Sequence, residues 1–150
     1  SNIGLVYNHL GNSQKALAYY NLALPIIRGI DDKLVRPLEF NTLNNIGSLY
    51  SELGDQEKAL EFYYQALQIK NQIGGKIGNA SILSNMGVAF EDLGDKQKAL
   101  DYYYQALQVA KETEDKALEA LILGNLMISL KGVPKSDLAI FYGKQSVNVY

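Results

Sequence analysis

The sequence predicts an all-α fold, an array of about four helical hairpins stacked one after another. The first observation is an internal repeat, because residues 45–69 and 85–109 are identical at 14 of 25 positions, without a gap, at an offset of 40 residues. The second is apolar spacing: within each half of a repeat, apolar residues recur every three or four positions, as in an amphipathic helix. A period of this size is typical of stacked repeats, which bury their apolar faces against their neighbours.

Four copies of the repeat fill the chain, the first at an offset of 43 residues and the fourth as a weaker match. The approximate repeats are residues 1–30, 31–73, 74–113 and 114–150. We expect the first helices of the hairpins near residues 34–53, 77–93 and 117–131. The second helices are expected near residues 13–24 or beyond, 56–72, 96–112 and 135–150.

A short turn joins the two helices of each hairpin, so the helices must run antiparallel. Three glycines are placed to end first helices in a left-handed conformation: Gly11, Gly54 and Gly94. The residues that follow them are suited to cap the second helices: Asn12, Asp55 and Asp95. Pro25 is expected to kink or end its helix near Leu24.

Small and aromatic residues recur at fixed places in the repeats. Gly47 with Ala59, and Gly87 with Ala99, would let the helices of a hairpin approach closely. The recurrent aromatic residues are expected to fill the space between neighbouring hairpins: Tyr50, Tyr63, Phe90 and Tyr103. Runs of tyrosine such as residues 102–104 cannot all face inward, and we interpret the outer rings as packing between repeats with their hydroxyls in water.

The composition excludes several functional classes. Fourteen Lys and Arg against 16 Asp and Glu give a net charge of −2, without the basic excess that favours nucleic acid. The chain has no cysteine and one histidine, so we expect no metal, no cofactor and no catalytic triad, and we predict that it is not an enzyme. No segment has the roughly 20 apolar residues of a membrane span. We expect a cytoplasmic protein without a signal peptide.

The repeat resembles the tetratricopeptide repeat (TPR), and the resemblance covers essentially the whole chain. The residues that carry it in the second copy are Leu43, Ile46, Gly47, Tyr50, Ala59 and Tyr63. Those of the third copy are Leu83, Met86, Gly87, Phe90, Ala99 and Tyr103. The resemblance implies a right-handed α-α superhelix whose first helices line a concave groove, and a function in binding a protein or peptide. Departures are a Leu where the family has Trp and a period longer than 34 residues.

Two finer resemblances concern the origin of the protein. The period of 40 to 43 residues is similar to the long-helix TPR subgroup of kinesin light chains and bacterial peptide-sensing regulators. Residues 138–150 resemble the last repeat of bacterial proteins that join a TPR array to a caspase-like CHAT domain. The array starts part-way into a helix and stops without a capping helix, so we expect it to be a piece of a longer protein. An alternative function is intramolecular control of a downstream effector domain such as CHAT.

An asparagine recurs at one position of the first helices and forms a ladder of Asn45, Asn85 and Asn125. The resemblance implies that the ladder runs along the groove, and an amide can pair with both the N–H and the C=O of an extended peptide. The same helical stripe adds further candidate residues: Asn41, Ser48, Glu52, Ser81, Val88, Asp92, Leu121 and Ile128. The alternative is that each asparagine bonds to the neighbouring helix and fixes the geometry of the repeats.

The nature of the partner follows in part from the charges near this stripe. Glu52, Glu91 and Asp92 make its middle acidic, so we expect a partner with Lys or Arg there. The lysines and arginines that would grip a chaperone-type terminal carboxylate are missing, which disfavours such a clamp. The last hairpin has apolar residues without a following repeat to cover them, and self-association through them is expected: Ile140, Phe141, Val147 and Val149.

Overall fold

The computed structural model describes residues 2–30, 32–74, 78–131 and 134. These residues form seven α-helices and one 3₁₀ turn, and no strand occurs among them. The elements are α1 (Asn2–His9), α2 (Ser13–Arg28), η1 (Lys33–Val35), α3 (Arg36–Glu52), α4 (Gln56–Ile73), α5 (Asn79–Asp92), α6 (Lys96–Glu112) and α7 (Lys116–Leu130). The predicted all-α fold is confirmed, and the first and second helices expected within these residues are present.

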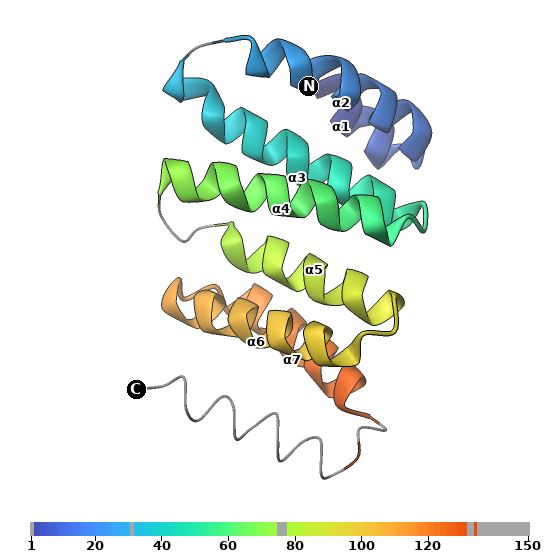
Figure 1. The fold of residues 1–150 in the computed structure, drawn as a ribbon, viewed down its shortest axis with the longest axis vertical. Coiled ribbons are helices and arrows are strands. Elements are labelled where there is room, and N and C mark those ends of the chain that lie inside the picture. The colour runs from blue at the N-terminus through green and yellow to red at the C-terminus, as the bar shows by residue number, and fades with distance from the viewer. Residues whose placement is uncertain (1, 31, 75–77, 132–133, 135–150) are drawn as a thin grey trace.

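The helices stack in chain order, and each packs against the helix before it and the helix after it (Figure 1). Three complete hairpins are described, α1–α2, α3–α4 and α5–α6, and α7 is the first helix of the fourth. The second helix expected at residues 135–150 and the apolar end expected to self-associate lie outside the described residues. None of the described helices is long and apolar enough to cross a membrane.

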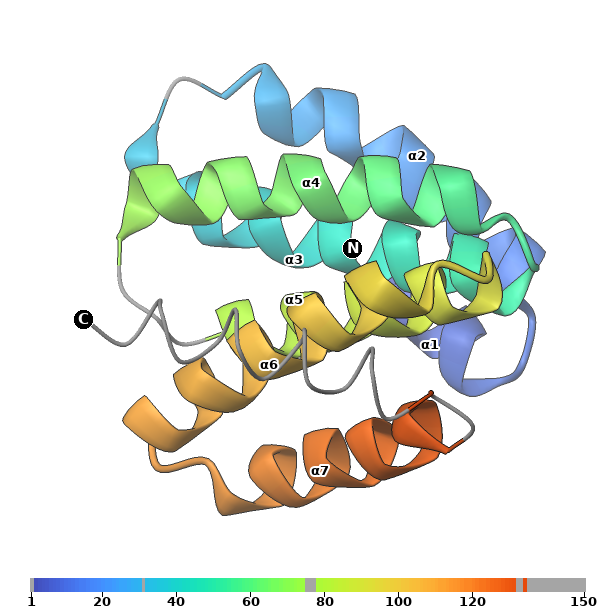
Figure 2. The same cartoon turned by 60° about the horizontal axis from the view of Figure 1, so that its bottom comes forward.

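The first helices lie on the inner side of the stack. Contacts between α3 and α5, and between α5 and α7, are more extensive than any between described second helices. The inner arc of a curved stack is the shorter one, so helices on that side approach one another more closely. Figure 2 shows the resulting layers, with α4 alongside α3 and α6 alongside α5. The face formed by α3, α5 and α7 is called the inner face below.

The predicted turns are confirmed, because all three glycines have positive φ and all three predicted caps accept a hydrogen bond. Gly94 has φ 82°, and the Asp95 carboxylate accepts from the backbone N–H of Lys98 at 3.1 Å. The junction between α6 and α7 uses the same geometry without a glycine. Glu114 has φ 57°, and the Asp115 carboxylate accepts from the N–H of Leu118. One turn geometry therefore serves both within hairpins and between them.

The large aromatic rings lie within hairpins, which corrects our expectation that they fill the space between hairpins. A Cβ on Gly47 would lie 2.6 Å from the Tyr63 ring, and one on Gly87 would lie 2.6 Å from the Tyr103 ring. Tyr63 and Tyr103 are 1% exposed and belong to the same hairpins as those glycines. The missing Cβ makes room for the ring, so the glycine and the tyrosine together set the approach of the two helices.

Pro25 does not end α2 near Leu24, which corrects that part of our expectation. The helix continues for four more residues, about one turn, and ends at Arg28, where the N–H of Gly29 donates to the carbonyl oxygen of Pro25. Proline costs the helix one N–H donor, and its fixed φ is compatible with a helix. Leu24 and Ile27 are both buried, and their packing stabilises this last turn.

A substitution at the tightest helix contact tests this packing. Gly87→Ala should destabilise the protein by about 1–3 kcal/mol, because the new methyl group would overlap the Tyr103 ring. Gly124→Ala in α7 is the control, since a Cβ there meets no atom within 4 Å. It should stabilise the protein by about 0.5–1 kcal/mol through helix propensity. Urea unfolding measures both, and equal effects of the two variants would contradict the packing described.

The junction before α7 offers a second test. Glu114→Gly should stabilise the protein by roughly 0.5–1 kcal/mol, because a left-handed conformation costs other residues more than it costs glycine. The reciprocal variant Gly94→Glu should destabilise it by a similar amount, about 1 kcal/mol. Thermal unfolding would show opposite shifts in Tm. A lower Tm for Glu114→Gly would mean that the Glu114 side chain contributes more than its backbone strain costs.

Candidate functional site

The residues of the stripe predicted from the sequence belong to α3, α5 and α7, and none of them is buried. Four members on α3 and α5 are half-buried: Asn45, Ser48, Asn85 and Val88. Asn125 is also half-buried, while the others are exposed: Asn41, Glu52, Ser81, Asp92, Leu121 and Ile128. The three first helices therefore present a continuous series of accessible positions, one group on each helix.

The first asparagine of the ladder has a structural partner. The side-chain Nδ2 of Asn45 donates to the hydroxyl oxygen of Tyr20 at 3.1 Å. This bond joins α3 to α2 of the preceding hairpin. Burial raises the pKa of Tyr20, and the hydrogen bond from Asn45 partly opposes this rise. Asn45 therefore bonds to the neighbouring hairpin, as expected if the asparagine fixes the geometry of the repeats.

The other two asparagines differ from Asn45. Within the described part of the chain, the side chains of Asn85 and Asn125 make no hydrogen bond. The tyrosines equivalent to Tyr20 turn to their own hairpins instead. Tyr63 donates to Ser48 Oγ at 3.3 Å, and Tyr103 donates to Glu91 Oε2 at 3.0 Å. The amides of Asn85 and Asn125 are thus left available to another molecule.

Val88 explains why the two tyrosines choose different partners. It occupies in the third repeat the place that Ser48 holds in the second, and it offers no acceptor. The Tyr103 hydroxyl therefore bonds to Glu91. Burial, followed by this bond to a carboxylate, raises the pKa of Tyr103.

Two acidic residues of the stripe connect neighbouring hairpins. Glu52 Oε2 accepts from Ser13 Oγ at 3.0 Å, and Asp92 Oδ2 accepts from Gln56 Nε2 at 2.8 Å. Ser13 and Gln56 are the first residues of α2 and α4, so the same contact recurs at two successive junctions. Sequence reasoning placed these acids in the groove and missed their structural bonds. Each carboxylate keeps further acceptor positions for a ligand.

The stripe becomes apolar toward α7. Leu121 is 59% exposed and Ile128 is 64% exposed, and Met127 on the same helix is also exposed. Exposed aliphatic side chains and amide groups together suit an extended segment, because its main chain needs hydrogen bonds and its apolar side chains need apolar contacts. Within the described residues, no group of His, Cys, Asp and Glu could hold a metal ion.

Tyrosines of the second helices stack within their own hairpins, Tyr19 on Tyr7 and Tyr102 on Phe90. This agrees only in part with our interpretation of the tyrosine runs, because contact between repeats is made through hydroxyls. The hydroxyls of Tyr64 on α4 and Tyr102 on α6 lie 2.9 Å apart, and the Tyr64 side chain is exposed. Burial, followed by the hydrogen bond with Tyr64, raises the pKa of Tyr102.

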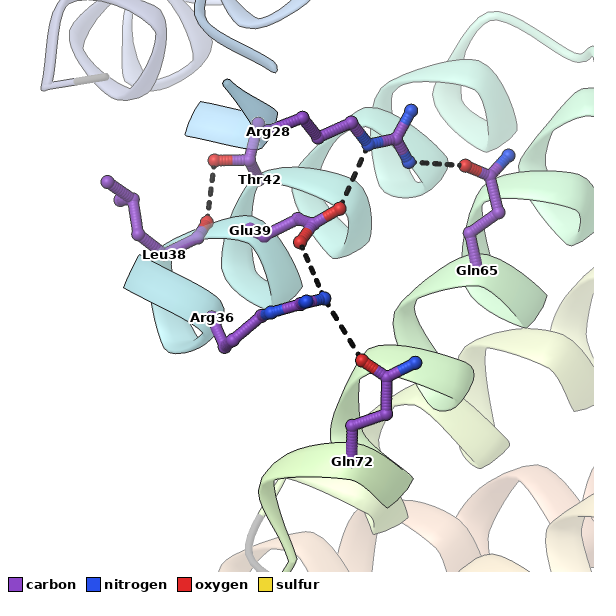
Figure 3. Close-up of polar contacts among 7 residues, drawn as sticks. All are labelled: Arg28, Arg36, Leu38, Glu39, Thr42, Gln65 and Gln72. Atoms are coloured by element: carbon purple, nitrogen blue, oxygen red, sulfur yellow. Dashed lines mark hydrogen bonds and ion pairs between the residues drawn. The ribbon is translucent and has the colours of Figure 1, made fainter. Parts of the chain in front are cut away.

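Sequence reasoning missed an ion-pair cluster around a buried glutamate between the first two hairpins (Figure 3). Glu39 is 6% exposed, and its carboxylate lies 2.9 Å from Arg28 Nε and 3.7 Å from Arg36 Nη1. The same arginines donate to α4, Arg28 to Gln65 Oε1 at 2.8 Å and Arg36 to Gln72 Oε1 at 3.0 Å. A glutamate on the buried side of the predicted helix was the signal that could have revealed it.

The different bonding of the asparagines predicts different effects on stability. Asn45→Ala should destabilise the protein by about 0.5–1.5 kcal/mol, because it leaves the buried Tyr20 hydroxyl without its partner. Asn85→Ala should change stability by less than about 0.5 kcal/mol. Urea unfolding of both variants checks this. A loss at Asn85 as large as that at Asn45 would show that Asn85 is structural.

Comparisons with known proteins agree with this architecture. The tetratricopeptide repeat family matches residues 1–72 and again residues 80–112. No curated protein matches the sequence. Among solved structures, the chain is similar to BtubC (BKLC) from P. vanneervenii, with a TM-score of 0.69 and 26% identity over 84% of this chain and 51% of that one. It is also similar to the apo form of RapI, with a TM-score of 0.82 and 18% identity over 96% of this chain and 52% of that one.

The chain thus spans about half the length of each of these two structures. The likeness to RapI concerns the fold alone. Repeats of this kind generally form non-catalytic modules for protein interaction. Residues 1–72 and 80–112 of this chain consist of tetratricopeptide repeats, and they form the all-α superhelix that the sequence predicts.

Proposed function

We propose that the chain binds an extended peptide or protein segment along the inner face of α3, α5 and α7. The observation that carries this proposal is the state of Asn85 and Asn125. Both are half-buried, and neither side-chain amide makes a hydrogen bond within the described residues. A partly desolvated amide gains most from a partner, because protein atoms already shield it from part of the solvent. An extended main chain supplies both the donor and the acceptor that it needs.

The charges and apolar residues of the inner face define the occupant further. Glu52 and Asp92 are exposed acids that keep free acceptor positions, so a Lys or Arg of the ligand is favoured beside α3 and α5. Leu121 and Ile128 offer exposed aliphatic surface on α7. The proposed ligand is therefore an extended segment with a basic residue at one end and an apolar residue at the other.

The ligand is either a separate protein or another part of the same protein. The resemblance of residues 138–150 to the last repeat of TPR–CHAT proteins favours the second source, an effector domain held or restrained by the array. The similarity in repeat length to the long-helix subgroup favours a peptide ligand. Both occupants would use the same amides, so the same variants test them.

The test starts from a peptide selected for binding to the chain from a random peptide library. Asn85→Ala and Asn125→Ala should each weaken binding by up to about tenfold, the equivalent of one hydrogen bond. Asn21→Ala, an exposed asparagine on the second helix α2, is the matched control and should leave affinity unchanged. Methylation of the peptide amide that faces Asn85 should cause the same loss, and the loss should not add to that of Asn85→Ala.

Two results would contradict the proposal. One is a peptide that binds the Asn85→Ala and Asn125→Ala variants as tightly as the parent. The other is equal loss in the Asn21→Ala control, which would place the ligand on the second helices. Replacing the Lys or Arg of the peptide with Gln should also weaken binding, and this difference should shrink as salt screens Glu52 and Asp92.

A further inference from the structure

Two cavities lie at the junction between the first and second hairpins, and Arg36 lines both. The larger has a volume of about 320 Å³, and its lining residues are Ile27, Arg28, Ile30, Val35, Arg36 and Glu39. The smaller has a volume of about 250 Å³ and is lined by Lys33, Arg36, Gln72 and Ile73. The larger cavity lies between α2 of the first hairpin and η1 and α3, so it depends on how two hairpins stack, while the smaller one lies between η1, α3 and α4.

The described lining residues of these cavities carry an excess of positive charge. Arg28, Lys33 and Arg36 give three positive charges, and Glu39 gives one negative charge, a local net charge of +2. The whole chain has a net charge of −2, so this site opposes the average charge of the protein. An anion entering the cavities would be attracted by this excess of positive charge.

The two arginines have donors to spare. Arg28 uses Nε and one terminal nitrogen for Glu39 and Gln65, and its other terminal nitrogen makes no hydrogen bond within the described residues. Arg36 binds Glu39 and Gln72 through Nη1. Both side chains are nearly half exposed, at 46% and 44%. Glu39 and the two glutamines thus hold the guanidinium groups in place. Each guanidinium has five N–H donors, and these bonds do not use all of them.

Aliphatic side chains accompany these charges. Ile27, Ile30 and Val35 form part of the wall of the larger cavity. The same segment exposes four large aliphatic side chains: Ile26 at 68%, Ile30 at 48%, Leu34 at 84% and Leu38 at 46%. Exposed apolar residues and arginine are both typical of surfaces that bind a protein partner.

We infer that this junction binds the carboxylate of an Asp or Glu side chain in a protein segment whose neighbouring residues are aliphatic. The carboxylate would pair with the free donors of Arg28 and Arg36, and Lys33 would add to the attraction. A phosphate group fits less well, because the Glu39 carboxylate repels a dianion more strongly and aliphatic walls do not solvate it. The site uses no residue of the inner face, so it is independent of the proposed function.

The probe is the tripeptide acetyl-Leu-Glu-Leu-amide, titrated into the isotopically labelled protein and followed by NMR. Saturable shifts are expected in the backbone amides of residues 26–38. The matched peptide with Gln in place of Glu should bind about tenfold more weakly, the value of one charge-assisted hydrogen bond. Arg36→Gln and Lys33→Gln should each reduce this preference. Lys96→Gln, which removes one exposed charge from α6, should preserve it.

Lys33 is exposed and its side chain makes no hydrogen bond within the described residues, so Lys33→Gln should not disturb the fold. If Arg36→Gln impairs folding, the Lys33→Gln variant alone tests whether the preference for Glu depends on this site. Equal binding of the Glu and Gln peptides would overturn the inference. Shifts confined to the inner face, or no shift at all, would do the same. A parallel titration with inorganic phosphate should give little response, and tighter binding of phosphate than of the Glu peptide would overturn the assignment to a carboxylate.

Discussion

A tyrosine ring in the space of a missing Cβ determines how closely the two helices of a hairpin pack. Tyr63 lies against Gly47 and Tyr103 against Gly87, with both rings almost fully buried. The rings place their hydroxyls at the first helix, where Ser48 and Glu91 accept. This choice of acceptors leaves the Asn85 amide without a partner among the described residues. The packing of the core and the chemistry of the first helices therefore have one cause.

The second constraint is the repetition of one turn. A residue with positive φ followed by a capping side chain joins α3 to α4, α5 to α6 and α6 to α7. The turns within the hairpins and the turn between α6 and α7 therefore share one backbone geometry, which lets successive helices stack in a similar way. The junction between α2 and α3 differs, with a 3₁₀ turn and a buried carboxylate, and residues of this turn line both cavities around Arg36.

Local features of the fold could be predicted from the sequence, because helix periodicity, glycine turns and Asn or Asp caps depend on neighbouring residues. Contacts between distant residues could not. The sequence does not reveal that Asp92 bonds to Gln56, or that Glu39 lies between Arg28 and Arg36, because these pairs depend on how hairpins stack. The stripe of the inner face was predicted from the repeat, yet its members differ in bonding, since a single replacement such as Val88 redirects a tyrosine.

The most direct test of the central packing is NMR observation of the Hα protons of Gly47 and Gly87. Each should show strong nuclear Overhauser effects to the ring protons of Tyr63 or Tyr103, and ring currents should displace its resonance from the usual position. Gly124, which has no neighbour at the Cβ position, supplies the reference and should resonate near the ordinary value. Ordinary Hα shifts at Gly47 and Gly87, without contacts to the rings, would contradict the account.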